Sequence, residues 1–241
     1  MLDQISLENL LFIDIETVPE KASYNDLPPL QQKLWLEKFT KTAPDCQNVA
    51  EEYPNHAGIY AEFGKIICIS AGYFFTTGEQ KNLRIKSYYG DNERTLLQEF
   101  LESLTRFQEK KRFLQLCGHN IREFDVPFIC RRAIINDLTL PPLLQFHGKK
   151  PWEVMLLDTM QLWRFGDHRN YISLNLLAGV LNIATPKDDI DGSQVGHAYW
   201  QEGNLPRIVT YCQKDVLTVA QIILRFCRIP LLSDQNVETL S

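Results

Sequence analysis

Runs of apolar residues recur along the chain at spacings that are typical of buried strands. The run at 10–16 is followed by two more, at 64–75 and 83–90, which flank a short turn-rich connector and predict an antiparallel pair. A fourth run, at 113–120, ends in a glycine and a polar tip. The pattern therefore predicts three neighbouring N-terminal strands and one later core strand.

Helical spacing of apolar residues dominates the rest of the chain. It predicts helices over about 91–109, with Asp91 as the cap, and over about 125–136 and 205–226. Ser173 is expected to cap a further short helix. Strands that are neighbours along the chain, followed by crossover helices, indicate an α/β fold with a mixed sheet covered by helices.

The length of 241 residues is typical of one large domain. We expect a single domain at 1–230 with an insertion at about 19–58, a stretch with few strand signals and five of the twelve prolines. Leu30 and Leu34, with Leu36 or Phe39 after them, lie at helical spacing, so the insertion is expected to be partly helical. The polar residues at 231–241 are expected to form a loose tail.

Charge and composition narrow the class of protein only slightly. The net charge of −5 argues against binding of nucleic acid by bulk positive charge, but it leaves room for local basic clusters, such as those at 110–112, 131–132 and 149–150. Each cluster is also typical of a solvated face. The chain has no apolar run of membrane-spanning length and no CxxC pair among its six cysteines, and its first residues include acids instead of a basic region. We therefore expect a cytoplasmic protein that has no signal peptide and does not enter membranes.

Carboxylates stand at three places where apolar segments end. Asp14 and Glu16 share one face of the first strand, because residues i and i+2 of a strand point the same way. Asp125 begins a predicted helix, and Tyr211 and Asp215 lie one turn apart in the last helix. Each feature alone also has an ordinary interpretation: solvated strand-end acids, a helix cap, or a surface pair.

Together the four acids indicate a site for metal ions, which none of them indicates alone. Hard cations such as Mg²⁺ and Mn²⁺ prefer oxygen ligands, and two such ions can stabilise both the attacking and the leaving oxygen of a phosphodiester displacement. Cations at this place would also convert the repulsion between Asp14 and Glu16 into attraction for the ions.

Three segments carry a resemblance to a known family: Ile13-Asp14-Ile15-Glu16, then Gly118 through Phe128, then Tyr211-Cys212-Gln213-Lys214-Asp215. They resemble the motifs of DEDD-type 3′–5′ exonucleases of the DEDDy subgroup. The greatest similarity is to the proofreading domain of family-B DNA polymerases, whose later motifs read Asn-x-x-x-Phe-Asp-x-Pro and Tyr-Cys-x-Lys-Asp. Their order agrees, with separations of 111 (14 to 125) and 90 residues (125 to 215).

The resemblance implies a ribonuclease-H-like mixed sheet with three antiparallel N-terminal strands flanked by helices. Because a polymerase palm domain would not fit in this length, the chain resembles a free-standing relative of the proofreading domain, as found among predicted bacterial exonucleases. The resemblance also implies a metal-dependent enzyme that hydrolyses phosphodiester bonds at the 3′ end of single-stranded DNA. The products would be nucleoside 5′-monophosphates, and the mechanism would use two metal ions.

Residue roles follow from the resemblance alone. Asp14, Glu16 and Asp215 would bind one divalent cation, and Asp14 and Asp125 would bind the second, with Mg²⁺ or Mn²⁺ as the cofactors. Tyr211 would orient the attacking water. The expected substrate contacts are Thr17 at the 3′ end, Asn120 and Phe124 at the terminal nucleotides, and Lys214, which is equally typical of a solvent-facing lysine.

Two alternatives remain open at this stage. An exonuclease that trims RNA 3′ ends would have the same motifs, because nothing in the sequence identifies a residue that reads the 2′-hydroxyl group. A non-catalytic nucleic-acid-binding module of the same fold is disfavoured, because no acidic position is lost. The sequence identifies no protein partner, and the insertion that follows the first motif is placed to narrow the substrate groove.

Overall fold

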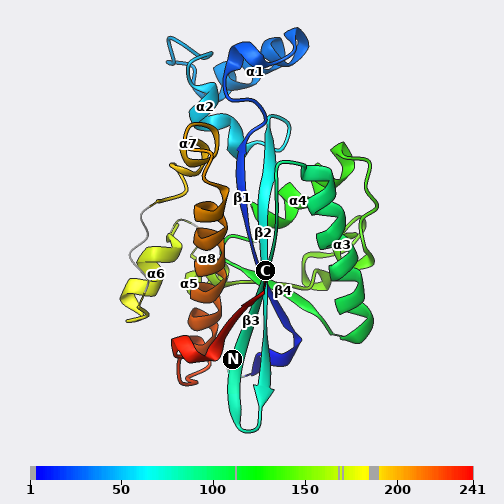
Figure 1. Cartoon of the computed structure of the whole chain (residues 1–241), viewed down its shortest axis with the longest axis vertical. Helices are drawn as coiled ribbons and strands as arrows, with labels where there is room; N and C mark the ends of the chain where they lie inside the picture. The colour runs from blue at the N-terminus through cyan, green and yellow to red at the C-terminus, as the bar shows by residue number, and fades with distance from the viewer. Residues whose placement is uncertain (1–3, 112, 168, 170, 185–189, 241) are drawn as a thin grey trace.

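One mixed sheet forms the centre of the computed structural model (Figure 1). In the described part of the chain it has six strands in the order β5-β4-β1-β2-β3-β6. Strand β2 is antiparallel to both β1 and β3, whereas β4 is parallel to β1 and β5 to β4. The structure describes residues 4–111, 113–167, 169, 171–184 and 190–240. The strands are β1 (Leu10–Pro19), β2 (Gly64–Thr77), β3 (Gln80–Tyr89), β4 (Gln115–Gly118), β5 (Leu156–Asp158) and β6 (Val237–Leu240).

Helices cover both faces of this sheet (Figure 1). On one face lie α3 and α4, and on the other the long helix α8 with α5 and α6 beside it. This arrangement confirms the predicted ribonuclease-H-like mixed sheet with three antiparallel N-terminal strands. The helices are α3 (Glu93–Lys110), α4 (Asp125–Ile135), α5 (Thr159–Arg164), α6 (Leu174–Val180), α7 (Val195–Trp200) and α8 (Leu205–Phe226).

The alternation of side chains along β1 decides which face receives its acids. Ile13 and Ile15 are buried in the core with residues of α3 and α4, whereas Phe12 is buried in the core with residues of α8. Because successive strand residues point to opposite faces, Asp14 and Glu16 continue the row of Phe12. The two acids therefore lie on the α8 side of the sheet.

The segment between β1 and β2 forms a small helical unit with its own core. Trp35 is fully buried there, and its ring centroid lies 4.9 Å from that of Phe39 and 5.3 Å from that of Tyr53. Leu30 and Leu34 are not part of this core, because their exposed fractions are 67% and 44%. The aromatic rings make the core instead, since they bury more apolar area per residue. The helices of this segment are α1 (Pro29–Thr42), α2 (Tyr53–His56) and the 3₁₀ turn η4 (Ala57–Ile59).

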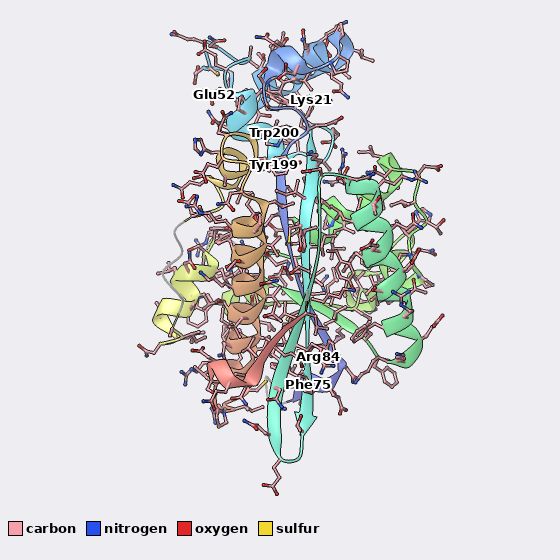
Figure 2. The ribbon with its side chains drawn as sticks, in the orientation of Figure 1. Lys21, Glu52, Phe75, Arg84, Tyr199 and Trp200 are labelled. Carbon is pink, nitrogen blue, oxygen red and sulfur yellow. The ribbon has the colours of Figure 1, made fainter. Side chains whose placement is uncertain are left out.

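The C-terminal segment corrects a prediction. Residues expected to form a loose tail form β6, which pairs in parallel with β3. Arg84 of β3 donates from Nε to Glu238 at 2.9 Å, and Asn236 donates to Asn82 at 3.1 Å. Figure 2 shows Arg84 beside Phe75 at the lower end of the molecule, where β6 is added. The edge of β3 offers unpaired backbone groups, and the tail satisfies them.

Two helix starts test the predicted caps. Ser173 caps α6 as predicted, and its Oγ accepts a hydrogen bond from Leu176 N at 3.3 Å. Helix α3 is capped by Asn92 instead of Asp91, whose carboxylate accepts a hydrogen bond from the Tyr199 hydroxyl at 2.7 Å. None of the helices in the described ranges has the length and apolar character needed to cross a lipid bilayer.

Candidate active site

The acids of the first motif stand at an irregular point of β1. Asp14 is half-buried and Glu16 is only 7% exposed. The register between β1 and β2 shifts between Glu16 and Thr17, which marks a bulge. Bulges re-aim side chains and are common next to active sites. The regular alternation of β1 therefore extends through Glu16 and is interrupted before Thr17.

Asp125 is brought to β1 by the start of α4. It is the first residue of that helix rather than its cap, and it is 4% exposed. Its Oδ1 accepts a hydrogen bond from the backbone N–H of Ile15 at 3.2 Å. Since Ile15 lies between Asp14 and Glu16, this bond connects the second motif directly to the first.

Helix α8 supplies the third motif. Tyr211 and Asp215 are one helical turn apart, and their side chains are hydrogen-bonded to each other. Burial raises the pKa of the Tyr211 phenol, and the charges of Asp215, Glu16 and Asp14 raise it further. The phenol therefore keeps its proton near neutral pH, and it lies within electrostatic reach of three of the four acids.

The acids raise one another's pKa values. Burial is the main cause for Asp14, followed by the charges of Asp215, Glu16 and Asp125, and its pKa lies well above the usual range. Burial followed by the charge of Asp215 raises the pKa of Glu16 in the same way. The pKa of Asp125 is raised to about 7, mainly by burial, although hydrogen bonds from backbone N–H groups oppose the shift. The site is thus a small volume of crowded negative charge.

The donor set fits hard divalent cations. Potential ligand atoms of Asp14, Glu16 and Cys212 all lie within 4.8 Å of one another. Cys212 is a poor ligand for such a cation, because a thiol is soft and burial holds its pKa well above the usual range. Among the described residues, Oδ2 of Asp14 is buried without a hydrogen-bond partner, which is costly unless a cation compensates it. The carboxylate oxygens are thus suited to Mg²⁺ or Mn²⁺.

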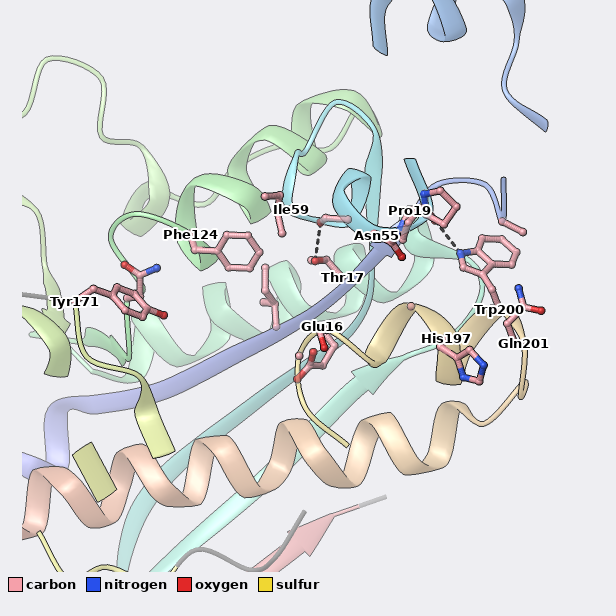
Figure 3. A pocket seen from close by; sticks show the side chains of 18 residues that line it. Glu16, Thr17, Pro19, Asn55, Ile59, Phe124, Tyr171, His197, Trp200 and Gln201 are labelled. Atoms are coloured by element: carbon pink, nitrogen blue, oxygen red, sulfur yellow. Dashed lines mark hydrogen bonds between the residues drawn. The ribbon is translucent and has the colours of Figure 1, made fainter. Parts of the chain in front are cut away.

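Two adjoining cavities lie over these acids. One, of about 370 Å³, is lined by all four acids and Tyr211; the other, of about 640 Å³, begins at Glu16 and extends towards the helical segment between β1 and β2. Figure 3 shows the second cavity between Phe124 and Tyr171 at one end and Trp200 at the other. The residues that line both cavities are Ile15, Glu16, Asn120, Phe124, Tyr171 and Gly192.

The larger cavity has walls that are fixed to β1. Thr17 donates from Oγ1 to the carbonyl of Gly58 at 2.8 Å, and Trp200 donates from Nε1 to the carbonyl of Pro19 at 3.1 Å (Figure 3). The first bond attaches the end of the insertion to β1, and the second attaches α7. Segments far apart in the sequence therefore form one groove beside the acids.

Three of the four predicted substrate residues line these cavities. Phe124 and Asn120 line both, and Thr17 lines the larger one. Asn120 adopts a positive φ of 62°, and in the described part of the chain its Oδ1 is buried without a hydrogen-bond partner. Lys214 is half-buried on α8 and is not among the described residues that line either cavity.

Several residues of the groove are not among those predicted from the sequence. Tyr171 is 67% exposed and lines both cavities, and the larger cavity is also lined by Asn55, His197 and Trp200. None of them belongs to a motif or to a periodic pattern that marks a site. The exposed aromatic ring in a loop is the one signal that the sequence offered for Tyr171.

Two polar residues near the motifs support the site rather than form it. The carboxylate of Asp158 accepts hydrogen bonds from the backbone N–H groups of Asn120 and Arg122 at 3.1 and 3.2 Å, and it also caps α5. His119 bonds through Nε2 to the carbonyl of Ile172 at 2.8 Å. These bonds fix the loop that carries Asn120 and the segment that carries Tyr171.

Comparison with known proteins agrees with this geometry. Residues 59–237, more than half of the chain, match the family model described as a predicted 3′–5′ exonuclease related to the exonuclease domain of PolB. The chain belongs to this family. Membership confirms the predicted enzyme class, a 3′–5′ exonuclease, and makes its substrate a nucleic acid. The match includes Asp125, Tyr211 and Asp215 but begins after Asp14 and Glu16.

Other comparisons add little to this assignment. The family B DNA polymerase from the hyperthermophilic archaeon Pyrobaculum calidifontis aligns with 94% of this chain at 14% identity and a TM-score of 0.48. The alignment covers 27% of the polymerase, so the chain spans about a quarter of its length. A likeness this distant carries no argument about residue roles. No curated protein sequence matches the chain significantly.

Proposed function

We propose that the chain hydrolyses the terminal phosphodiester bond at the 3′ end of single-stranded DNA and releases nucleoside 5′-monophosphates. The observation that carries the proposal is the convergence of Asp14, Glu16, Asp125 and Asp215, from three segments, around an unpartnered buried carboxylate oxygen. Such a cluster is unfavourable in the protein alone. Because the chain belongs to an exonuclease family, we infer that the acid cluster attracts cations that take part in hydrolysis.

Two divalent cations fit this set. Asp14, Glu16 and Asp215 would hold one, and Asp14 and Asp125 would hold the other. When bound, the pair supplies an activated water and neutralises charge on the attacking and leaving oxygens. The hydrogen bond from Ile15 N to Asp125 then keeps one ligand in place, which limits the reorganisation that catalysis requires.

Tyr211 positions the attacking water in this proposal. Its phenol is hydrogen-bonded to Asp215, within reach of the charges of Asp14 and Glu16, and its raised pKa keeps it protonated. Because its one proton is used in the bond to Asp215, the phenol oxygen would accept a hydrogen bond from the water and orient it without having to ionise. The role is therefore one of orientation, and the carboxylates of the cluster would take the proton from the water.

The cavity beside Thr17 would receive the terminal nucleoside. Its volume of about 640 Å³ lies in the range of small-ligand sites, and Phe124 and Tyr171 offer aromatic faces for stacking of bases. The insertion and α7 close the far side of this cavity. A wall on this side gives the end of a strand a place to stop, which favours attack at an end.

Labelled oligonucleotides test the proposal. Single strands carrying a label at the 5′ end should give a ladder that shortens from the 3′ end, and a 3′ label should appear as a mononucleotide, only when Mg²⁺ or Mn²⁺ is present. The Asp14→Asn variant should be inactive, and Asp45→Asn, at an exposed acid outside the site, should retain activity. If a matched RNA strand is cut faster than DNA, the substrate is RNA rather than DNA. If the protein binds strands tightly but does not cleave them, it is a binding module rather than an enzyme.

A further inference from the structure

A third cavity lies on the other side of the first turn of α4. It has a volume of about 320 Å³. Its floor is mostly apolar and half-buried, and two arginines line it, Arg122 and Arg131. Besides the arginines it is lined by Val126, Pro127, Cys130, Phe146, Val154 and Leu156. A cavity of this kind matches a nucleotide, which combines a flat apolar base with a phosphate.

Arg122 is held in a fixed position. Its Nη2 donates to the carbonyls of Val154 at 3.3 Å and Leu156 at 2.9 Å, and its backbone N–H donates to Asp158. Among the described residues these side-chain bonds use only Nη2, so Nε and Nη1 keep donors for an oxygen ligand. A guanidinium fixed in this way loses little entropy when it binds a phosphate.

Lysines and aromatic rings extend the arginine pair along the surface. Lys149 Nζ lies 5.9 Å from the ring centroid of Phe146, and Lys150 Nζ lies 5.3 Å from that of Trp152. Trp152 is 76% exposed. In the described part of the chain no ion pair joins Arg131, Lys149 or Lys150 to an acid. In a protein of net charge −5, this is a local concentration of cations interleaved with aromatic side chains.

The cavity adjoins the acid cluster through one short loop. Asn120 lines the cavity over the acids and Arg122 lines this one, and two residues span at most about 7 Å. Likewise Asp125 and Val126 are neighbours in the chain but line different cavities. A polymer that passes from the acids over this loop would reach the arginines within one or two nucleotide steps.

We propose that this cavity, together with Lys149, Lys150 and Trp152, binds a nucleotide unit of the substrate strand on the 5′ side of the bond that is cut. The arginines and lysines contact phosphates, and the faces of Phe146 and Trp152 contact bases. The assignment rests on the proposed function, because it takes the terminal nucleoside to lie on the Thr17 side of the acids. Charge complementarity favours a single-stranded nucleic acid, and stacking needs unpaired bases.

The decisive variant removes three exposed cations at once, Arg131→Ala with Lys149→Ala and Lys150→Ala. Its control removes three exposed lysines elsewhere, Lys33→Ala, Lys41→Ala and Lys110→Ala. Both triple variants are also prepared with Asp14→Asn, and binding of a fluorescent 20-nucleotide single strand is measured between 50 and 200 mM salt. We expect affinity for the strand to fall about tenfold in the first variant only, with a salt slope reduced by about 2.

A second measurement separates this inference from the proposed function. Thymidine 5′-(p-nitrophenyl phosphate) has no nucleotide on the 5′ side, so its hydrolysis with Mn²⁺ should have the same kcat and KM in the triple variant as in the unaltered protein. KM for the 20-nucleotide strand should rise about tenfold. If the unaltered protein hydrolyses neither substrate, the proposed function is wrong. The binding measurement then still shows whether the cavity binds a single strand.

Three results would overturn the inference. The first is an unchanged salt slope in the triple variant, and the second is an equal loss of affinity in the control variant. The third is inhibition of p-nitrophenol release by a free mononucleotide that the triple variant abolishes, because that result assigns the cavity to an effector. Thermal unfolding of each variant shows whether the protein remains folded. Trp152→Ala, at an exposed ring, should raise KM for the strand about fivefold without altering the salt slope.

Discussion

Glu93 and Glu16 are both buried carboxylates, but their surroundings are opposite in character. Glu93, at the start of α3, accepts hydrogen bonds from Arg132 Nε at 2.8 Å, Arg132 Nη2 at 2.5 Å, Asn136 and Ile66 N, and it is 7% exposed. Glu16 is equally buried but is surrounded by other acids. The chain neutralises the first carboxylate with its own groups, whereas it surrounds the second with further negative charge.

This difference distinguishes a structural charge from a functional one. The bidentate contact between Glu93 and Arg132 joins α3 to α4 and, through Ala61 and Ile66, to the sheet. It is complete without a ligand. The acid cluster is incomplete without one, because burial and mutual repulsion raise the pKa values of Asp14, Glu16 and Asp125. Burial alone therefore does not indicate function, whereas burial without a counter-charge does.

The largest expected effect is on catalysis when a charge is removed from the cluster. Asp14→Asn should lower kcat on the order of 10³-fold, because transition-state charge loses its preorganised environment. The same variant should be at least as stable as the unaltered protein without metal, because it relieves repulsion. Steady-state rates and thermal melts check both parts. A loss of stability in the metal-free variant would contradict the description of Asp14 as a strained, unpaired charge.

For the ion pair between Glu93 and Arg132 we expect the opposite outcome, a loss of stability without a loss of activity. Glu93→Gln should destabilise the protein by about 3–5 kcal/mol, because it leaves the buried guanidinium of Arg132 without a counter-charge. Activity per folded molecule should be unchanged. Glu99→Gln, at an exposed position of the same helix, is the control and should alter stability by less than about 0.5 kcal/mol. Urea unfolding curves measure the difference, and equal midpoints for the two variants would contradict it.

The stability of the metal-free protein should fall as pH rises. The pKa of Asp125 is raised from 3.8 to about 7, so the folded protein retains a proton that the unfolded chain releases near pH 4. This contribution to stability is fully present below about pH 4 and is lost as pH rises through about 7, on the order of a few kcal/mol. Melting temperatures in EDTA at pH 5 and pH 8 measure it.

Metal ions should reverse this pH dependence. Mn²⁺ should raise the melting temperature more at pH 8 than at pH 5, since protons compete for the same oxygens. In Asp125→Asn the loss of stability between the two pH values should be smaller. An unaltered pH dependence in that variant would mean that the crowding of Asp125 with the other acids has no measurable free energy.

The smallest effect is expected for Tyr211, the uncharged residue of the site. Tyr211→Phe should lower kcat about 10- to 100-fold, because the attacking water loses an orienting hydrogen-bond partner while the charges remain. Stabilisation by Mn²⁺ should be retained, which distinguishes the phenol from the acids. Tyr73→Phe, at a tyrosine that bonds Arg84, is the control and should leave kcat unchanged. Loss of Mn²⁺ stabilisation in Tyr211→Phe would make the phenol part of the metal site.

The sequence alone was sufficient for the parts of the fold with strong local signals. The helices α3, α4 and α8 follow from apolar residues at helical spacing, and the alternation in β1 places Asp14 and Glu16 on one face. It was insufficient where long-range partners decide. The insertion buries Trp35 rather than Leu30, and the tail pairs as β6, since both depend on neighbours that the local pattern does not reveal.

The candidate site divides in the same way. The sequence by itself determined the type of each acid and the side of its strand or helix, because the periods of 2.0 and 3.6 residues are local properties. Only the tertiary structure decided that Asp125 bonds to Ile15 N and that α7 and the insertion are fixed to β1 beside Glu16. The same is true of the contrast between Glu93 and the acid cluster. The physical reason is that the state of a buried charge depends on what surrounds it, and those surroundings come from segments far apart in the chain.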